Sequence, residues 1–280
     1  MSISVREPVS AFVTVNGVRL HYVEWGEASN PHVVMLHGAS SNCHNWDFLC
    51  RALADDYHIL ALDQRGHGDS GRPASGYHPA DYAADLAAFR DALGLERIRL
   101  IGHSMGGRVS LLHVSESGQQ VVGLVLVDCG PGAARAGLER ITQAIVNAPE
   151  SFADEQEAYA YIKLLRPRYS HETLQNRVRH ALRRREDGRL AWKYDREALL
   201  QSIHASAGVD WWDCLARVSC PTLLVRGAES DILPRDVARR MVDVMPACEL
   251  VEVAEGSHAV PFEDTAVFEG AVRRLLSRLA

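Results

Sequence analysis

Residues 99–108, RLIGHSMGGR, decide the fold. An apolar run stops at Gly102, Ser104 follows two residues later, and Gly106 leads into a segment whose apolar residues have helical spacing. A Gly-x-Ser-x-Gly pattern between a strand and a helix is the nucleophile elbow, a sharp turn that exposes the serine hydroxyl. Glycine stands on both sides of the serine because a side chain there would collide with the strand or the helix. A five-residue pattern also arises by chance, so the surrounding sequence has to decide its meaning.

Continuous apolar runs alternate with helical segments on both sides of this turn, as in a parallel sheet covered by helices. Each run ends in a polar or glycine-rich loop, and these loops contain Gly38, Asp63, Ser104 and Asp128. Because the carboxyl ends of parallel strands lie along one edge, we expect the loops to meet at one cleft. The predicted fold class is α/β, with a mostly parallel sheet and helices on both faces. The runs are residues 32–36, 58–62, 98–101, 122–127, 221–227 and 249–253.

The pattern changes twice along the chain. At the start, residues 12–23 contain Asn16-Gly17 between two alternating segments, which predicts an antiparallel hairpin at the sheet edge. After Gly130, residues 131–212 show helical spacing and no convincing buried strand, and they carry most of the tryptophan. We therefore predict a core domain of residues 1–130 and 213–280, with residues 131–212 inserted as a helical cap over the cleft.

Composition narrows the class of protein. The 280 residues are 47% apolar and 24% charged, which is typical of a globular protein, and the formal net charge of −6 argues against a nucleic-acid partner. No stretch is long enough to span a membrane, and the first residues lack the apolar segment of a signal peptide. The six cysteines show no CxxC spacing, so we expect reduced thiols in a cytoplasmic protein. We expect the protein to be a monomer or a homodimer. Metal-binding HExxH and phosphate-binding GxxxxGK[ST] motifs are also missing, so neither a metal nor another cofactor is expected.

A serine hydroxyl needs a base, and the base needs an acceptor on its other nitrogen. His258 follows the last apolar run and is the expected base. Asp231 follows the run before it and is the expected acid, since the order Ser, Asp, His accompanies the nucleophile elbow. Glu229 and Asp128 are alternatives for the acid, because both also follow strands that end at the same edge.

An oxyanion formed at Ser104 would need two backbone donors. One is expected to be the amide of Met105, at a helix N-terminus that favours negative charge, and the other the amide of Ala39. We expect a small-molecule substrate, with contacts from His37, Ser40, His103 and Trp192.

Several segments together resemble the α/β-hydrolase fold, and in particular its capped esterases, epoxide hydrolases and C–C hydrolases. The resemblance implies an eight-stranded sheet, and it implies Ser104 as nucleophile, Asp231 as acid, His258 as base, and the Ala39 and Met105 amides as the oxyanion hole. Residues 63–70 resemble a structural loop of the family without a catalytic role. The matching segments are residues 33–38, 62–70, 102–107, 221–227 and 256–258.

Serine at the elbow argues against the aspartate-based epoxide hydrolases and dehalogenases that the resemblance includes. We expect a carboxylic-ester hydrolase of class EC 3.1.1, acting on an ester, lactone or thioester through an acyl-enzyme on Ser104. One alternative is hydrolysis of a C–C bond in a product of aromatic-ring cleavage, whose carboxylate the arginine-rich cap could hold. Most of those arginines are expected to form a solvated helix face. Another alternative is a non-catalytic ligand receptor. The arginines are Arg166, Arg168, Arg177, Arg179, Arg183, Arg184 and Arg185.

Overall fold

The structure is a computed structural model that describes residues 7–132 and 134–279. Predictions for residues 1–6, 133 and 280 lie outside these ranges. The main-sheet strands are β1 (Val9–Val15), β2 (Val18–Trp25), β3 (His32–Leu36), β4 (His58–Leu62), β5 (Ile98–His103), β6 (Val121–Val127), β10 (Thr222–Gly227) and β11 (Cys248–Val253).

Within the described residues these eight strands form one sheet in the order β1-β2-β4-β3-β5-β6-β10-β11. The pairs from β4 to β11 are parallel, and β2 pairs antiparallel with both β1 and β4. The predicted hairpin is present, with Asn16 and Gly17 both at positive φ in its turn. The predicted α/β fold class with a mostly parallel eight-stranded sheet is therefore confirmed.

Helices cover both faces of the sheet, as expected. Alternate residues of a buried strand point to opposite faces, so Val34 and Leu36 pack with α2, α3, α8 and α9, whereas Val33 and Met35 pack with α1 and α11. These helices and the shorter ones of the core are η1 (Cys43–Trp46), α1 (Asp47–Leu53), α2 (Pro79–Ala92), α3 (Met105–Ser117), η2 (Gly118–Gln120), α8 (Trp211–Ala216), α9 (Arg235–Val244), α10 (Val260–Glu263) and α11 (Thr265–Leu276).

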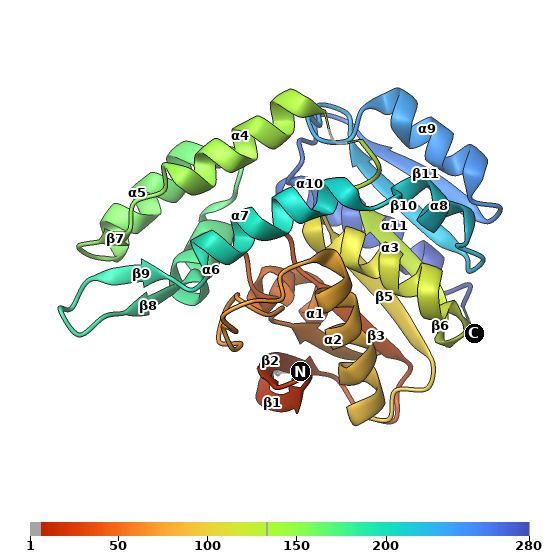
Figure 1. Ribbon diagram of the computed structural model, residues 1–280, viewed down its shortest axis with the longest axis horizontal. Coiled ribbons are helices and arrows are strands. Elements are labelled where there is room, and N and C mark those ends of the chain that lie inside the picture. The colour runs from red at the N-terminus through yellow and green to blue at the C-terminus, as the bar shows by residue number, and fades with distance from the viewer. Residues whose placement is uncertain (1–6, 133, 280) are drawn as a thin grey trace, which may run out of the picture.

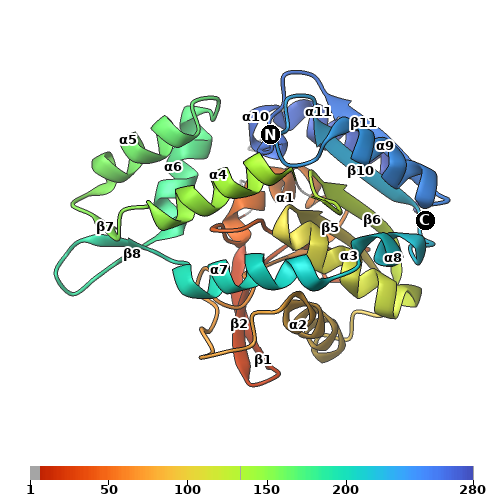
Figure 2. The same ribbon diagram turned by 45° about the horizontal axis from the view of Figure 1, so that its top comes forward.

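The chain leaves the sheet after β6 and returns to it at β10, and the intervening cap extends to one side of the core (Figure 1). Its helices α4 and α7 reach from the cap to the core in both views (Figures 1 and 2). The cap elements are α4 (Arg135–Val146), β7 (Ser151–Phe152), α5 (Glu155–Leu165), α6 (His171–Ala181), β8 (Leu182–Arg184), β9 (Leu190–Trp192), α7 (Arg196–Ala205) and η3 (Ser206–Gly208).

The cap differs from the sequence expectation in two respects. In the described part of the cap, β7, β9 and β8 form a small antiparallel sheet, although no strand was expected there. These strands have only two or three residues, and the exposed arginines of β8 hide any apolar alternation. In addition, α8 starts inside the predicted cap, yet its Trp211 packs into the core beneath α3.

Apolar contacts fix the cap against the loop that carries His258. Phe152, Ile162 and Leu174 of the cap form a cluster with Ala259 and Phe262 of the core. The ring of cap residue Tyr169 meets that of Phe262 edge to face. This packing places α5 and α6 beside the carboxyl edge of the sheet.

Among the described helices, none is both long enough and apolar enough to cross a bilayer.

Candidate active site

Ser104 lies at the tip of the turn between β5 and α3, as the elbow pattern predicts. Its φ of 52° and ψ of −114° place it in a strained region for a residue with a side chain. A Cβ on Gly106 would collide with the backbone carbonyl groups of Leu36 and His37, and a Cβ on Gly102 would collide with Gly106. Glycine is therefore required at both positions for strand and helix to approach each other.

His258 meets the serine from the loop after β11. Its Nε2 lies 2.9 Å from Ser104 Oγ, and its Nδ1 lies 2.7 Å from Asp128 Oδ2. The imidazole thus links a hydroxyl to a carboxylate, and a proton on Nδ1 directed to Asp128 leaves Nε2 able to accept the serine proton. The expected contact between Ser104 and His258 is present.

Asp231 does not contact the histidine, so the expectation that it orients His258 is wrong. Its carboxylate forms a bidentate ion pair with Arg140 of cap helix α4, in which Nε lies 2.5 Å from Oδ2 and Nη2 lies 2.8 Å from Oδ1. Hydrogen bonding to Arg140 is the main cause that lowers the pKa of Asp231. The alternative Glu229 is engaged similarly, by Arg168 of the cap at 2.5 Å.

The partner of His258 is Asp128, the remaining alternative. It directly follows β6, which lies between β5 and β10, so its carboxylate is fully buried beside the elbow. The Gly227 amide and the Ser230 hydroxyl also donate to it, at 3.2 and 2.5 Å. A carboxylate right after an unbroken apolar strand has to be buried and therefore needs partners, and this is the sequence signal that favours Asp128.

The two predicted oxyanion donors, Ala39 and Met105, line one cavity together with Ser104. Met105 is the first residue of α3, so its amide has no acceptor within the helix. Ala39 follows Gly38, where a Cβ would lie 2.8 Å from His103 Nδ1 and 3.3 Å from Ser104 Cβ. Glycine at position 38 thus lets the loop after β3 run against the nucleophile.

Three of the four predicted substrate contacts line the cavity above Ser104, namely Ser40, His103 and Trp192. His37 does not, and its expected role is wrong. It is 1% exposed, its Nδ1 lies 2.8 Å from Gly38 O, and its Nε2 accepts the Gln64 amide at 3.1 Å. Both ring nitrogens therefore hold neighbouring loops together instead of facing a substrate.

Cap residues that were not predicted as site residues complete the cavity. Tyr161 and Tyr194 line it, as do Arg140, Arg166 and Arg177. Arg166 and Arg177 belong to the arginine-rich segment, most of which is exposed as expected. Sequence spacing gave no means of telling which arginines turn inward, because α6 carries a buried stripe of only a few residues.

Comparisons with known proteins agree with the fold. A family model described as the alpha/beta hydrolase fold matches residues 31–265. The chain belongs to the α/β-hydrolase family. It is 27% identical to a 3-hydroxybutyrate-oligomer hydrolase of Cupriavidus necator over 278 residues, with 89% of each chain covered. It is 30% identical to an N-formylmaleamate deformylase of Pseudomonas putida, with 90% of each chain covered.

Solved structures of hydrolases also match. The crystal structure of E-2-(acetamidomethylene)succinate hydrolase has a TM-score of 0.91 and 25% identity, with 97% of this chain and 100% of that chain covered. These relatives are hydrolases that act on different bonds, so the comparisons support hydrolysis by this α/β-hydrolase without selecting the bond.

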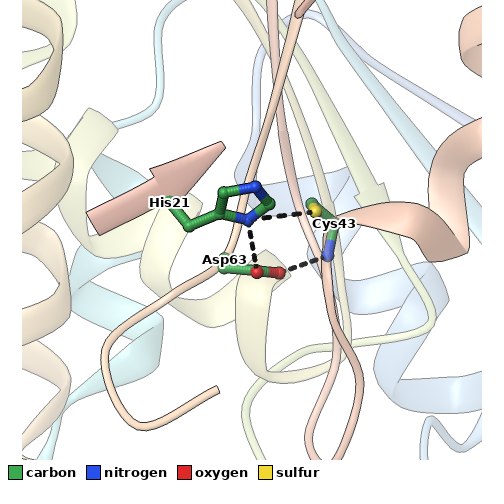
Figure 3. A group of neighbouring side chains, drawn as sticks. All are labelled: His21, Cys43 and Asp63. Atoms are coloured by element: carbon green, nitrogen blue, oxygen red, sulfur yellow. Dashed lines mark hydrogen bonds and ion pairs between the residues drawn. The ribbon is translucent and has the colours of Figure 1, made fainter. Parts of the chain in front are cut away.

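A second group of reactive side chains lies away from Ser104 (Figure 3). His21, Cys43 and Asp63 point toward one another, with His21 Nδ1 at 2.7 Å from Asp63 Oδ2 and 3.8 Å from Cys43 Sγ. Asp63 also accepts the backbone amides of Cys43 and Asp69, at 2.6 and 2.9 Å. Burial, and next the charge of Asp63, raise the pKa of the Cys43 thiol well above its usual value. The thiol is therefore neutral, and the group serves as the structural core of the loop at residues 63–70.

Replacing Asp63 with alanine is expected to lower the free energy of unfolding at pH 7 by about 3–5 kcal/mol, since buried donors lose their charged acceptor. Burial by itself raises the pKa of Asp63, but the His21 hydrogen bond and the other donors outweigh it and lower the pKa below its ordinary 3.8. The stabilisation is therefore present above about pH 4 and declines as the pH falls below it.

Urea unfolding of both proteins at several pH values measures this effect. The difference in unfolding free energy should shrink on acidification, while the exposed control Asp243→Ala stays within about 0.5 kcal/mol of wild type throughout. A difference between wild type and Asp63→Ala that does not change with pH would contradict the assignment.

Proposed function

We propose that this α/β-hydrolase cleaves carboxylic esters, including lactones and thioesters, through an acyl-enzyme on Ser104. The observation that carries the proposal is the continuous hydrogen-bonded chain from Ser104 Oγ through His258 to Asp128, at the base of a cavity roofed by the cap. A serine so placed is the arrangement used for acyl transfer on several unrelated folds.

In the proposed reaction Ser104 Oγ attacks the carbonyl carbon while its proton passes to His258 Nε2. The amides of Ala39 and Met105 donate to the oxygen that becomes negative, and Asp128 stabilises the imidazolium. His258 then gives the proton to the leaving group, which departs and leaves the acyl group on the serine. Water attacks this ester with His258 again as base, and the acid is released.

A second candidate is hydrolysis of a C–C bond next to a carbonyl group, and the cap arginines in the cavity favour it because products of ring cleavage carry carboxylates. The two candidates separate in one assay. Incubation with a coloured ring-cleavage product should leave its absorbance unchanged if the protein is an esterase. Rapid bleaching that Ser104→Ala abolishes would favour the C–C reaction.

Covalent labelling tests the nucleophile directly. A fluorophosphonate probe should add one probe mass per chain, and mass spectrometry of the digest should locate the adduct on Ser104. Wild type should also release p-nitrophenol from p-nitrophenyl acetate. Ser104→Ala should neither react with the probe nor release p-nitrophenol. Failure of wild type to react in both assays would contradict the proposed function and favour a ligand receptor.

A further inference from the structure

We infer that this site, acting as proposed above, removes a short acyl group from a leaving group that carries a carboxylate. The inference rests on the proposed serine chemistry and adds the substrate class. It follows from three features: two arginines without a carboxylate partner, a small apolar cavity, and the side of Ser104 on which His258 lies.

Arg166 and Arg177 bring positive charge into the cavity that contains Ser104. Within residues 7–132 and 134–279, neither has a carboxylate within ion-pair distance. Arg177 donates only to neutral acceptors, Ser40 O at 3.1 Å and Asn45 Oδ1 at 3.4 Å. Burial lowers the pKa of Arg177, and the charge of Arg166 adds to this effect. Placing two partly buried cations together without a carboxylate partner is costly, and a bound anion would reduce that cost.

Neighbouring arginines of the cap show the contrast. Arg140 also lines the cavity, but Asp231 holds its guanidinium at 2.5 Å. Arg168 lies outside the cavity and pairs with Glu229 at 2.5 Å. Carboxylates of the core thus neutralise Arg140 and Arg168, whereas Arg166 and Arg177 have no carboxylate partner among the described residues. A carboxylate suits them because it accepts charge-assisted hydrogen bonds from a guanidinium in a fixed planar geometry.

The other side of Ser104 is small and mostly apolar. A cavity of about 60 Å³ shares Ala39, Ser104 and Ile141 with the arginine-lined cavity. Leu138, Ile203 and Ile232 form much of its wall. Arg108 also contributes to this wall, but its guanidinium donates to Ser206 Oγ and Gly130 O. At about 10–15 Å³ per water-sized sphere, the space accommodates an acyl group of about four to six heavy atoms.

The position of His258 determines which part of the substrate occupies which of the two cavities. The leaving atom has to receive its proton from His258 Nε2, so the leaving group must lie on the histidine side of Ser104. Among the described residues, His258 lines the arginine cavity and does not line the apolar one. Met105, the expected oxyanion donor, lines the apolar cavity. The acyl group therefore occupies the apolar side, and the leaving group occupies the arginine side.

Ser104 Oγ forms a bond to the acyl carbon, and the bond from that carbon to the leaving oxygen or nitrogen breaks. The leaving atom takes the proton that Ser104 gave to His258, which releases a carboxylate-bearing alcohol or amine. Water next cleaves the acyl-serine ester and yields a short carboxylic acid.

Two isomers test the orientation. In 4-acetoxybenzoate the carboxylate is on the leaving group, and in monomethyl terephthalate it is on the acyl group. Wild type should show a kcat/KM for 4-acetoxybenzoate about 10–100-fold above that for the neutral methyl 4-acetoxybenzoate, whereas monomethyl terephthalate should react no faster than its neutral dimethyl ester, so that each comparison keeps the leaving atom the same. Lengthening the acyl group from acetyl to hexanoyl should lower kcat/KM at least about tenfold, and Ile203→Ala should recover part of that loss.

Variants separate the arginine subsite from the chemistry. Arg166→Met should bring the kcat/KM values for the charged and neutral acetate esters within about threefold of each other, mainly by raising the KM for the charged ester. Arg179→Met is the matched control, because Arg179 is exposed on α6 two residues after Arg177.

The outcomes are distinct. A preference for monomethyl terephthalate over its dimethyl ester would overturn the assignment of the two sides. Equal rates for charged and neutral esters in wild type would overturn the anionic substrate, although fluorophosphonate labelling of Ser104 would still support the serine chemistry. If no ester reacts and the probe does not label Ser104, the proposed function itself fails.

Discussion

Asp128→Asn is expected to lower kcat/KM for ester hydrolysis by about 10³–10⁴-fold, whereas Asp231→Asn should keep it within about threefold of wild type. Asparagine fits the same space but brings no charge to stabilise the imidazolium. Its amide can also donate to His258 Nδ1, which would place the imidazole proton on Nε2, the atom that must accept the serine proton. Asp231, in contrast, contacts Arg140 at the cap and takes no part in the hydrogen-bonded chain.

Initial rates with the neutral ester p-nitrophenyl acetate, measured from pH 6 to 9, provide the comparison. Because Asp128 also holds the Gly227 amide and the Ser230 hydroxyl, circular dichroism and thermal unfolding of each variant must accompany the kinetics. If Asp231→Asn lost activity and a folded Asp128→Asn kept it, the assignment of the acid from the structure would be reversed.

Ser104→Ala is expected to have the largest effect, a loss of about 10⁵–10⁶-fold in kcat with little change in folding. Alanine cannot form the acyl bond, and the oxyanion amides and the cavity alone retain only a small rate above that of water. The substitution should not destabilise the protein. The backbone at φ 52° is unchanged in kind, and the contact of the hydroxyl that is lost is the one with His258.

A quenched-flow assay with p-nitrophenyl acetate distinguishes the expected loss from a partial effect. Wild type should show a burst of p-nitrophenol equal to the enzyme concentration if deacylation is slower than acylation, and Ser104→Ala should show none. Ser115→Ala, on the same helix α3, is the matched control and should behave as wild type, since its hydroxyl donates only to Leu112 O. A rate equal to that of wild type in Ser104→Ala would show that Ser104 is not the nucleophile.

The sequence identified the parts of the site that local geometry determines. The elbow around Ser104 needs glycine at fixed offsets, and His258 lies in the short loop after the last strand, so both residues could be placed from motif and strand order. The acid could not be placed in this way, because Asp128, Glu229 and Asp231 all follow strands that end at one edge. Which of them reaches His258 depends on the loop after β10, where Asp231 turns toward Arg140 of the cap.

The cap shows the same limit. The alternation of apolar strands and helices predicted the main sheet, because its central strands are buried on both faces and their apolar pattern is strong. Strands β8 and β9 are short and mostly not buried, so they leave no clear apolar pattern. They form only because β9 pairs with both β8 and β7, and these pairings cannot be inferred from the sequence. The inward direction of Arg166 and Arg177 likewise depends on how the cap sits on the core.

All three residues of the Ser104–His258–Asp128 chain come from core loops, while the arginines of the cavity come from the cap. Displacing the cap would therefore leave the hydrogen bonds among these three residues intact, and it would remove the side chains that we propose select the leaving group and the acyl group. In the proposed mechanism, reactivity and selectivity therefore come from different parts of the chain. A graft of a different segment between β6 and β10 should change which compounds are accepted while the same serine performs the same bond-making step.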